Sequence, residues 1–358
     1  MYDFGNCLFY TTRLKKSKKR KENDRNQIEH RRTTEPTLDM NSRQNVWMPM
    51  YSKRARLLRP SPLLLNQLRI HIVQQHLSTP TTTSIPDTNA NKKACLIGIN
   101  YTGTPNRLYG CENDVRKIHH VLTHKCGYEA RNITVITEQT TIKPTRRNIL
   151  LQFVRLLIES KPGDQLFFGF SGHGYFVPDM DGDEEDGKDE IIITCENHYI
   201  VDDEFRALIH KYMKPDVQLF GFFDNCHSGT ILDLRYEYDI PLKTVPFTTI
   251  DDINIGRSSR EASTVPVQTN EQYVETPGQV ILLSGCRDEE KSVDAMINGR
   301  FNGVLTCTFM EIILNFPERL TWYDAVQEME FYIRKLGFEQ RPLLSTGRPI
   351  DLYSPVQF

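Results

Sequence analysis

The sequence predicts an α/β fold in which a mostly parallel β-sheet of about six strands or more is covered by helices on both faces. From residue 92 onward, short apolar runs of strand length alternate with amphipathic segments of helix length. Several of these runs are apolar throughout, which is typical of strands buried on both sides. Two runs end in glycine-containing turns that carry a histidine and a cysteine. Ligands of open α/β sheets bind at the carboxyl ends of strands, so these turns are candidate functional sites.

Each predicted element rests on its own pattern. The strands are expected at the apolar runs 94–100, 133–136, 165–170, 217–223, 280–284 and 342–345. The helices, which repeat apolar residues at three- and four-residue spacing, are expected at 113–122, 145–160, 202–212, 304–314 and 322–336. Residues 234–277 are polar and show no period, so we expect them to be irregular. The folded domain is therefore predicted to span residues 91–358.

Residues 1–90 differ in composition and are predicted to form a basic, largely disordered extension and linker. Residues 1–60 hold 15 Lys and Arg against 6 Asp and Glu, whereas the rest of the chain holds 29 against 40. The dense basic run at residues 13–21 has three readings: a nuclear-import signal, a patch for nucleic acid or an anionic membrane surface, or a solvated tail. No segment approaches the roughly 18 apolar residues of a membrane span, and no signal-peptide pattern is present. We expect a cytoplasmic protein, with the nucleus as a second compartment.

The eight cysteines include no CxxC pair, which disfavours a zinc site made of thiolates and fits a reducing compartment. One cysteine, however, lies in a chemically suggestive turn. The two turns are Phe168-Gly-Phe-Ser-Gly-His-Gly174 and Phe222-Phe-Asp-Asn-Cys-His-Ser-Gly229. A thiol reacts as the thiolate, and a nearby imidazole can take its proton and later protonate the leaving amine.

We therefore predict that His173 and Cys226 are the catalytic pair of a cysteine hydrolase. The backbone N–H groups of Gly174 and Cys226 are the predicted oxyanion donors. His227 is a competing base, but its place beside Cys226 in the sequence should turn its side chain away from the thiol. Taken singly, a histidine in a turn or a cysteine after an apolar run could equally be structural.

Six motifs in a fixed order resemble the metacaspases, which belong to the caspase-like clan of cysteine peptidases. They are Gly98-Ile-Asn-Tyr101, Gly110-Cys-Glu-Asn-Asp114, Ser171-Gly-His-Gly174, Val201-Asp-Asp203, Asp224-Asn-Cys-His-Ser-Gly229 and Ser284-Gly-Cys286. The resemblance spans about residues 92–350 and implies a caspase-like sheet with His173 and Cys226 as its dyad. It also implies a large-subunit region at 91–234, a short junction at 235–277 and a small-subunit region at 278–358.

The resemblance further implies cleavage after Arg or Lys. Asp114 and Asp224 match family positions that line an acidic specificity pocket, with Cys111 and Ser171 beside them. A carboxylate pair is suited to bind a guanidinium group through paired hydrogen bonds. The alternatives are that Asp114 caps its own helix and that Asp224 holds the cysteine turn.

A calcium site is implied in the same way. The matching positions are Asp189, Asp202, Asp203 and Asp233, and carboxylate oxygens are the ligands that Ca²⁺ prefers. The alternative is a solvated acidic face on which Asp202 caps the following helix.

Lys243, Arg257 and Arg260 lie in the polar junction, where a peptidase with a basic preference could cut itself. The same residues could serve solubility alone. The expected partners are protein or peptide substrates with Arg or Lys at the cleavage site, together with nucleic acid or an anionic surface at the basic run, and a monomer is expected. The alternative functions are a catalytically silent caspase-like interaction module and a nucleic-acid-binding protein.

Overall fold

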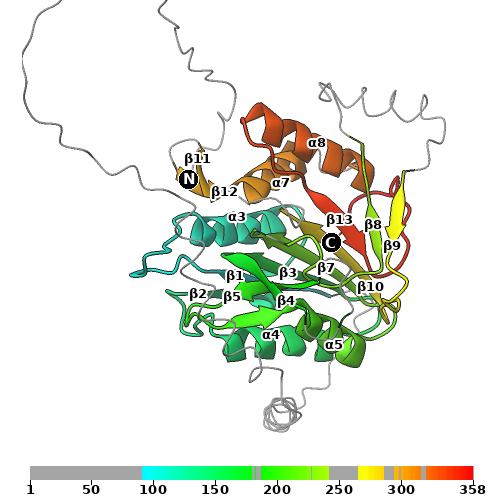
Figure 1. Ribbon diagram of the computed structural model, residues 1–358, viewed down its shortest axis with the longest axis horizontal. Helices are drawn as coiled ribbons and strands as arrows, with labels where there is room; N and C mark the ends of the chain where they lie inside the picture. The colour runs from blue at the N-terminus through cyan, green and yellow to red at the C-terminus, as the bar shows by residue number, and fades with distance from the viewer. Residues whose placement is uncertain are drawn as a thin grey trace, which may run out of the picture. The chain divides into compact units, whose positions relative to one another are not determined.

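The computed structural model describes residues 91–179, 182, 187–226, 228–241, 265–285, 294–297, 300–315 and 320–357. The predicted disordered extension at residues 1–90 lies outside these ranges. An eight-stranded sheet forms the centre of the fold (Figure 1). In spatial order its strands are β2 (Ile133–Thr137), β1 (Lys92–Gly98), β3 (Gln165–Ser171), β7 (Gln218–Asp224), β10 (Gln279–Ser284), β13 (Leu343–Thr346), β8 (Tyr236–Tyr238) and β9 (Val267–Thr269). The first five are parallel and the last three pair antiparallel, so the predicted mostly parallel sheet is confirmed.

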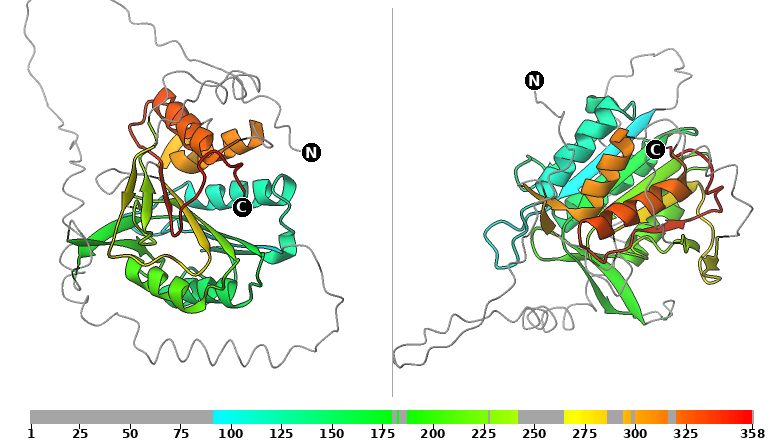
Figure 2. Two further views of the ribbon diagram at one scale, coloured as in Figure 1. Left: turned by 90° about the vertical axis from the view of Figure 1, so that its right-hand side faces the viewer. Right: turned by 90° about the horizontal axis from the view of Figure 1, so that it is seen from above.

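Helices cover both faces of this sheet, as predicted. One face carries α3 (Cys111–His124), α7 (Val304–Asn315) and α8 (Trp322–Lys335), and the other carries α4 (Arg146–Ile158) and α5 (Asp202–Tyr212) (Figures 1 and 2). A 3₁₀ turn, η3 (Ala130–Asn132), leads into β2. No helix in the described part of the chain has the length and apolar character to cross a membrane.

Two small sheets were not predicted. The first contains β4 (Gly174–Pro178), β5 (Lys188–Ile193) and β6 (Tyr199–Val201), and the second is the hairpin of β11 (Asp294–Ile297) and β12 (Arg300–Gly303). The prediction that residues 234–277 are irregular is wrong at β8 and β9, which extend the main sheet. Each of these two strands has three residues, too few to show a period, and every residue of β9 is exposed.

Alternating phenylalanines bind the two helical layers to the sheet. Successive side chains of a strand point to opposite faces, so the adjacent residues Phe222 and Phe223 of β7 contact different helices. The ring centroid of Phe222 lies 4.8 Å from that of Phe309 on α7, and that of Phe223 lies 6.1 Å from that of Phe205 on α5. All four side chains are buried, and each contributes about 1.5–3 kcal/mol of burial free energy. This packing holds the carboxyl end of β7, which precedes Cys226, in a fixed position.

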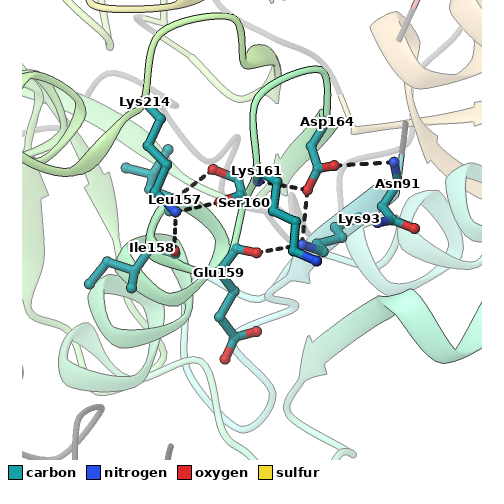
Figure 3. Close-up of polar contacts among 9 residues, drawn as sticks. All are labelled: Asn91, Lys93, Leu157, Ile158, Glu159, Ser160, Lys161, Asp164 and Lys214. Atoms are coloured by element: carbon teal, nitrogen blue, oxygen red, sulfur yellow. Dashed lines mark hydrogen bonds and ion pairs between the residues drawn. The ribbon is translucent and has the colours of Figure 1, made fainter. Parts of the chain in front are cut away.

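A buried carboxylate fastens the opposite end of the sheet, where β1 and β3 begin (Figure 3). Asp164 accepts hydrogen bonds from the backbone N–H groups of Asn91 and Lys161 at 3.2 and 2.9 Å, and its Oδ2 lies 3.0 Å from Nζ of Lys93. The same Nζ donates to the carbonyl oxygen of Glu159 just beyond α4, at 2.6 Å. Asp164 therefore joins the start of the folded domain to two strands and a helix.

Substituting Asp164 with alanine should lower the free energy of unfolding by about 2–4 kcal/mol, because two backbone donors and one ammonium group lose their acceptor. Chemical denaturation measures this change. The matched control is Glu129→Ala, which removes an exposed carboxylate paired with Arg131 and should cost less than about 0.5 kcal/mol. Equal losses in the two variants would contradict the role assigned to Asp164.

Candidate active site

Three neighbouring strands end at the same level at the functional edge of the sheet. The parallel register pairs Gly98 with Ser171 and Ser171 with Asp224, so these residues form one row across β1, β3 and β7. His173 and Cys226 each lie two residues beyond this row. Because adjacent strands are about 4.8 Å apart, the structure brings the predicted catalytic pair to neighbouring turns.

The two turns are packed directly against each other. A Cβ atom at Gly174 would collide with the carbonyl oxygen of Cys226 and with the side-chain amide of Asn225. The Asn225 amide in turn donates to the Cys226 carbonyl oxygen at 2.9 Å. Glycine is therefore required at position 174 for this close approach. The two turns therefore touch each other, and the oxyanion role of the Gly174 and Cys226 N–H groups stays a prediction.

One contact sets the protonation pattern of the His173 imidazole. Its Nε2 lies 2.7 Å from the backbone carbonyl oxygen of Asn106. A carbonyl oxygen can only accept, so Nε2 carries the hydrogen and Nδ1 is the basic nitrogen of the neutral ring. Sequence reasoning missed Asn106, because a contact made by a backbone carbonyl leaves no side-chain signature.

The predicted pocket residues Asp114 and Asp224 converge beneath the start of α7. Both are buried, at 1% and 4% exposure. Asp114 accepts a hydrogen bond from Oγ of Ser171 at 2.9 Å, and its two oxygens accept from the N–H of Gly303 at 3.1 and 3.0 Å. Asp224 accepts from the backbone N–H and the hydroxyl of Thr306 at 2.8 and 2.7 Å. The alternative in which Asp114 caps its own helix is wrong, because its carboxylate binds the residue that precedes α7.

Gly303 separates the two carboxylates. A Cβ atom at Gly303 would collide with the carboxylate of Asp224 and lie 3.0 Å from Oδ2 of Asp114. Burial raises the pKa of the Asp114 carboxyl well above its ordinary value, and the nearby charge of Asp224 raises this pKa further. Cys111, the first residue of α3, is also buried, and its carbonyl oxygen closely approaches Gly98. The sheet edge therefore presents a buried acidic pair beside the turns of His173 and Cys226.

Comparison with known proteins agrees with this geometry. A family model described as the metacaspase, peptidase C14 domain matches residues 92–235. Metacaspase-1 of Kluyveromyces lactis is 32% identical over 291 residues, which cover 73% of this chain and 67% of that protein. Metacaspase-1B of Aspergillus terreus is 33% identical over 290 residues, covering 73% of this chain and 76% of that protein. The chain belongs to the metacaspases. It is therefore a caspase-like cysteine-type peptidase, as the ordered motifs predicted.

One solved structure supports the fold of this metacaspase. The crystal structure of protein GSU0716 from Geobacter sulfurreducens aligns with a TM-score of 0.51 and 22% identity. The alignment covers 74% of this chain and 97% of that one. At this level of identity the likeness concerns the fold.

The predicted calcium residues gather at a second place in the metacaspase fold, where β5 meets the first turn of α5. Asp189, Asp202 and Asp233 are buried, so the alternative of a solvated acidic face is wrong for these three. Oδ2 of Asp202 accepts from the N–H of Glu190 at 2.5 Å, and its Oδ1 accepts from the N–H of Asp203 at 2.7 Å. The alternative in which Asp202 caps α5 is wrong, because Asp202 is the first residue of the helix and Val201 occupies the N-cap position. Burial, followed by the charges of Asp233 and Glu190, raises the pKa of Asp202 well above its ordinary value.

Arg206 supplies positive charge to this cluster. Its Nη2 lies 3.0 Å from Oδ1 of Asp203, and its Nε lies 3.8 Å from Oδ2 of Asp233. The guanidinium group also lies 4.7 Å from the ring centroid of Tyr273, whose hydroxyl donates to Asp233 at 3.4 Å. In the described ranges, no three His, Cys, Asp or Glu side chains converge as metal ligands do. Sequence reasoning missed Arg206, although its position three residues after Asp203 on α5 was a usable signal.

Several sequence-based predictions lie outside the described residues. They concern the competing base His227, the motif residue Cys286, the basic run 13–21 and the self-cleavage candidates Lys243, Arg257 and Arg260.

Proposed function

We propose that this metacaspase is a calcium-dependent endopeptidase that cleaves after Arg or Lys with Cys226 as nucleophile and His173 as base. The observation that carries this proposal is the aligned row of Ser171 and Asp224. The row brings Cys226, His173 and Asp224 to the ends of two adjacent strands, which supports the roles proposed for them.

The reaction follows from the groups at these two turns. Nδ1 of His173 accepts the thiol proton of Cys226, and the thiolate attacks the carbonyl carbon of the peptide bond. The N–H groups of Gly174 and Cys226 would stabilise the resulting oxyanion. The C–N bond then breaks, His173 returns its proton to the departing amine, and a thioester remains on Cys226. Water activated by His173 hydrolyses this thioester and regenerates the thiol.

The acidic pair accounts for the proposed preference for basic side chains. Holding two carboxylates together in a buried site is unfavourable, as the raised pKa of Asp114 indicates. The N–H groups of Gly303 and Thr306 offset this cost only in part, since they are neutral donors. A guanidinium or ammonium group from the substrate would bring the missing positive charge. A side chain of Asp would instead add a third negative charge.

Cleavage profiling on a peptide library, with calcium and with chelator, tests the proposal as a whole. We expect cut sites to follow Arg and Lys, and we expect no cleavage in chelator. Cleavage after Asp would contradict the acidic pocket, and equal rates in chelator would contradict the calcium requirement.

The acidic cluster has the donor chemistry that calcium requires. Asp189, Asp202, Asp203 and Asp233 offer carboxylate oxygens, and hard cations bind oxygen. A bound calcium ion would supply positive charge to these carboxylates, three of which are buried. Asp233 lies seven residues after Cys226, so its ion pair with Arg206 links the segment following the nucleophile to α5.

Removal of the Arg206 charge should tighten calcium binding. In the structure the guanidinium group pairs with Asp203 and Asp233, so a cation must compete with it for the same oxygens. We expect Arg206→Gln to lower the calcium dissociation constant about 10-fold by isothermal titration calorimetry, which corresponds to about 1.4 kcal/mol. The matched control Arg155→Gln breaks the ion pair between Arg155 on α4 and Glu159 at the end of that helix, and it should leave the constant unchanged. Weaker binding in Arg206→Gln would show that the guanidinium group does not compete with calcium.

Self-cleavage in the junction is expected to follow calcium addition. The candidate sites are Lys243, Arg257 and Arg260. Calcium-treated active protein should yield two fragments on a denaturing gel, and Cys226→Ala should stay intact. Replacing all three basic residues with Gln should stop the cut without lowering hydrolysis of a short peptide. Fragments of equal yield from the Cys226→Ala protein would point to a contaminating peptidase.

A further inference from the structure

Tyr101 lies beside His173 and makes an unusual set of contacts. Tyr101 lies three residues after the end of β1. In the sheet, β1 is next to β3, the strand that leads to His173. The side chain of Tyr101 is 4% exposed. None of the chemical steps described above uses this residue, although it contacts the proposed base through both its ring and its hydroxyl.

The hydroxyl of Tyr101 closes a network around the His173 backbone. It accepts a hydrogen bond from the His173 N–H at 2.8 Å and donates to the Ile193 carbonyl oxygen at 2.7 Å. Ile193 completes the network, because its N–H donates to the His173 carbonyl oxygen at 2.9 Å. Both polar groups of the His173 backbone are thus fixed, one by a tyrosine and one by the end of β5.

The ring of Tyr101 lies against the imidazole itself. The two ring centroids are 4.5 Å apart, with an interplanar angle of 34°. On its edge the imidazole donates through Nε2 to the Asn106 carbonyl oxygen. One contact restrains a face of the ring and the other restrains its edge, so together they limit rotation about both side-chain torsions of His173.

The backbone of Tyr101 adopts a strained conformation, which accompanies the position of its ring against His173. Its φ angle is +51°, in the left-handed region that costs a non-glycine residue roughly 1–2 kcal/mol. Glu138 holds the strained turn, because its carboxylate accepts from the N–H groups of Asn100 and Thr102 at 2.8 and 2.9 Å. Gly172 leaves room for the hydroxyl, since a Cβ there would lie 2.8 Å from it.

We propose that Tyr101 is a positioning residue that orients His173 toward Cys226, an inference that rests on the proposed catalytic pair. The ring fixes the plane of the imidazole, and the hydroxyl fixes the backbone that carries it. Loss of this alignment should slow the proton transfer from thiol to imidazole and leave substrate binding at the acidic pair intact.

Two variants separate the ring from the hydroxyl. Tyr101→Phe keeps the ring and should lower kcat about 3–10-fold, whereas Tyr101→Leu removes both contacts and should lower kcat about 100-fold. KM for an arginine peptide should stay within about threefold of the wild-type value in both. The matched control is Tyr128→Leu, which removes a buried tyrosine that packs on Phe167 in the core. It should reduce the melting temperature and leave kcat within twofold.

A second readout does not depend on peptide hydrolysis. Iodoacetamide alkylates the Cys226 sulfur: an S–C bond forms, iodide leaves and His173 takes the thiol proton. The alkylation rate, followed by mass spectrometry of the Cys226 peptide, should fall in the same order as kcat. Equal alkylation rates in wild type and in folded Tyr101→Leu would overturn the inference, as would unchanged kcat in both variants. A wild-type protein that cleaves no peptide would defeat the proposed function, and the alkylation rates would still decide the role of Tyr101.

Discussion

Replacement of Cys226 by alanine is expected to lower kcat/KM for an arginine peptide by at least about 10⁴-fold, because the proposed thioester forms on its sulfur. His173→Ala should cause a loss of similar size. The double variant should be no worse than either single one, since the two residues act as a unit in one proton transfer and one bond formation. Initial rates on a fluorogenic arginine peptide in calcium measure all three variants.

Cys126→Ala is the matched control. Cys126 is also a half-buried free thiol, but burial raises its pKa to about 11, so it is almost entirely protonated at neutral pH. Its replacement should leave kcat/KM within about twofold. A Cys226→Ala protein that retains a tenth of the wild-type rate would end the case for this nucleophile, provided that the rate survives repurification.

Neutralising the acidic pair is expected to cost about 10²–10³-fold in kcat/KM on an arginine peptide. Asp114→Asn and Asp224→Asn each leave a bound guanidinium group without one of its two charged partners, and loss of a buried charge partner costs about 2–5 kcal/mol. Citrulline has the shape of arginine without its charge. The same variants should therefore change kcat/KM on the matching citrulline peptide by less than about threefold. The ratio of kcat/KM on the arginine peptide to kcat/KM on the citrulline peptide should therefore fall steeply.

Asp324→Asn controls for the loss of a buried carboxylate as such. Asp324 is fully buried at the start of α8, where its Oδ2 accepts from the Thr321 hydroxyl at 2.6 Å. Its substitution should leave the arginine-to-citrulline ratio unchanged even if the protein is less stable. A ratio that is unchanged in Asp114→Asn as well would mean that the pair does not select the substrate.

The strands of the parallel core could be predicted because they consist mostly of apolar residues, as buried strands do. Phe222 and Phe223 lie in a run that is apolar on both faces, as expected for a strand between two helical layers. The strands at the other edge could not be predicted in this way. Tyr236–Tyr238 and Val267–Thr269 are too short to show a pattern, and they are defined by pairing with β13 and with each other.

The candidate site also has residues that the sequence reveals and residues that only the fold reveals. His173, Cys226 and the two pocket carboxylates stand in glycine-marked motifs, so residue type and spacing reveal them. Asn106 and Gly303 contribute backbone atoms, and a backbone atom is available from any residue type. The motif that contains Tyr101 predicts no role for this residue, because its contact with His173 depends on the alignment of β1 with β3. The spacing of Arg206 from Asp203 signals a local ion pair, but the contact of Arg206 with Asp233, 27 residues away, depends on the fold.

The pairing of β8 with β9 determines how a nicked form of this protein would behave. These strands lie inside the junction, near its two ends, and Tyr236 to Tyr238 lie in register with Thr269 to Val267. A break between these two strands would leave β8 and β9 paired, and the two fragments would still share the sheet through β7 with β10 and β8 with β13. The cut protein should therefore elute from a sizing column at the position of the uncut one and separate into two pieces only when the sheet is unfolded.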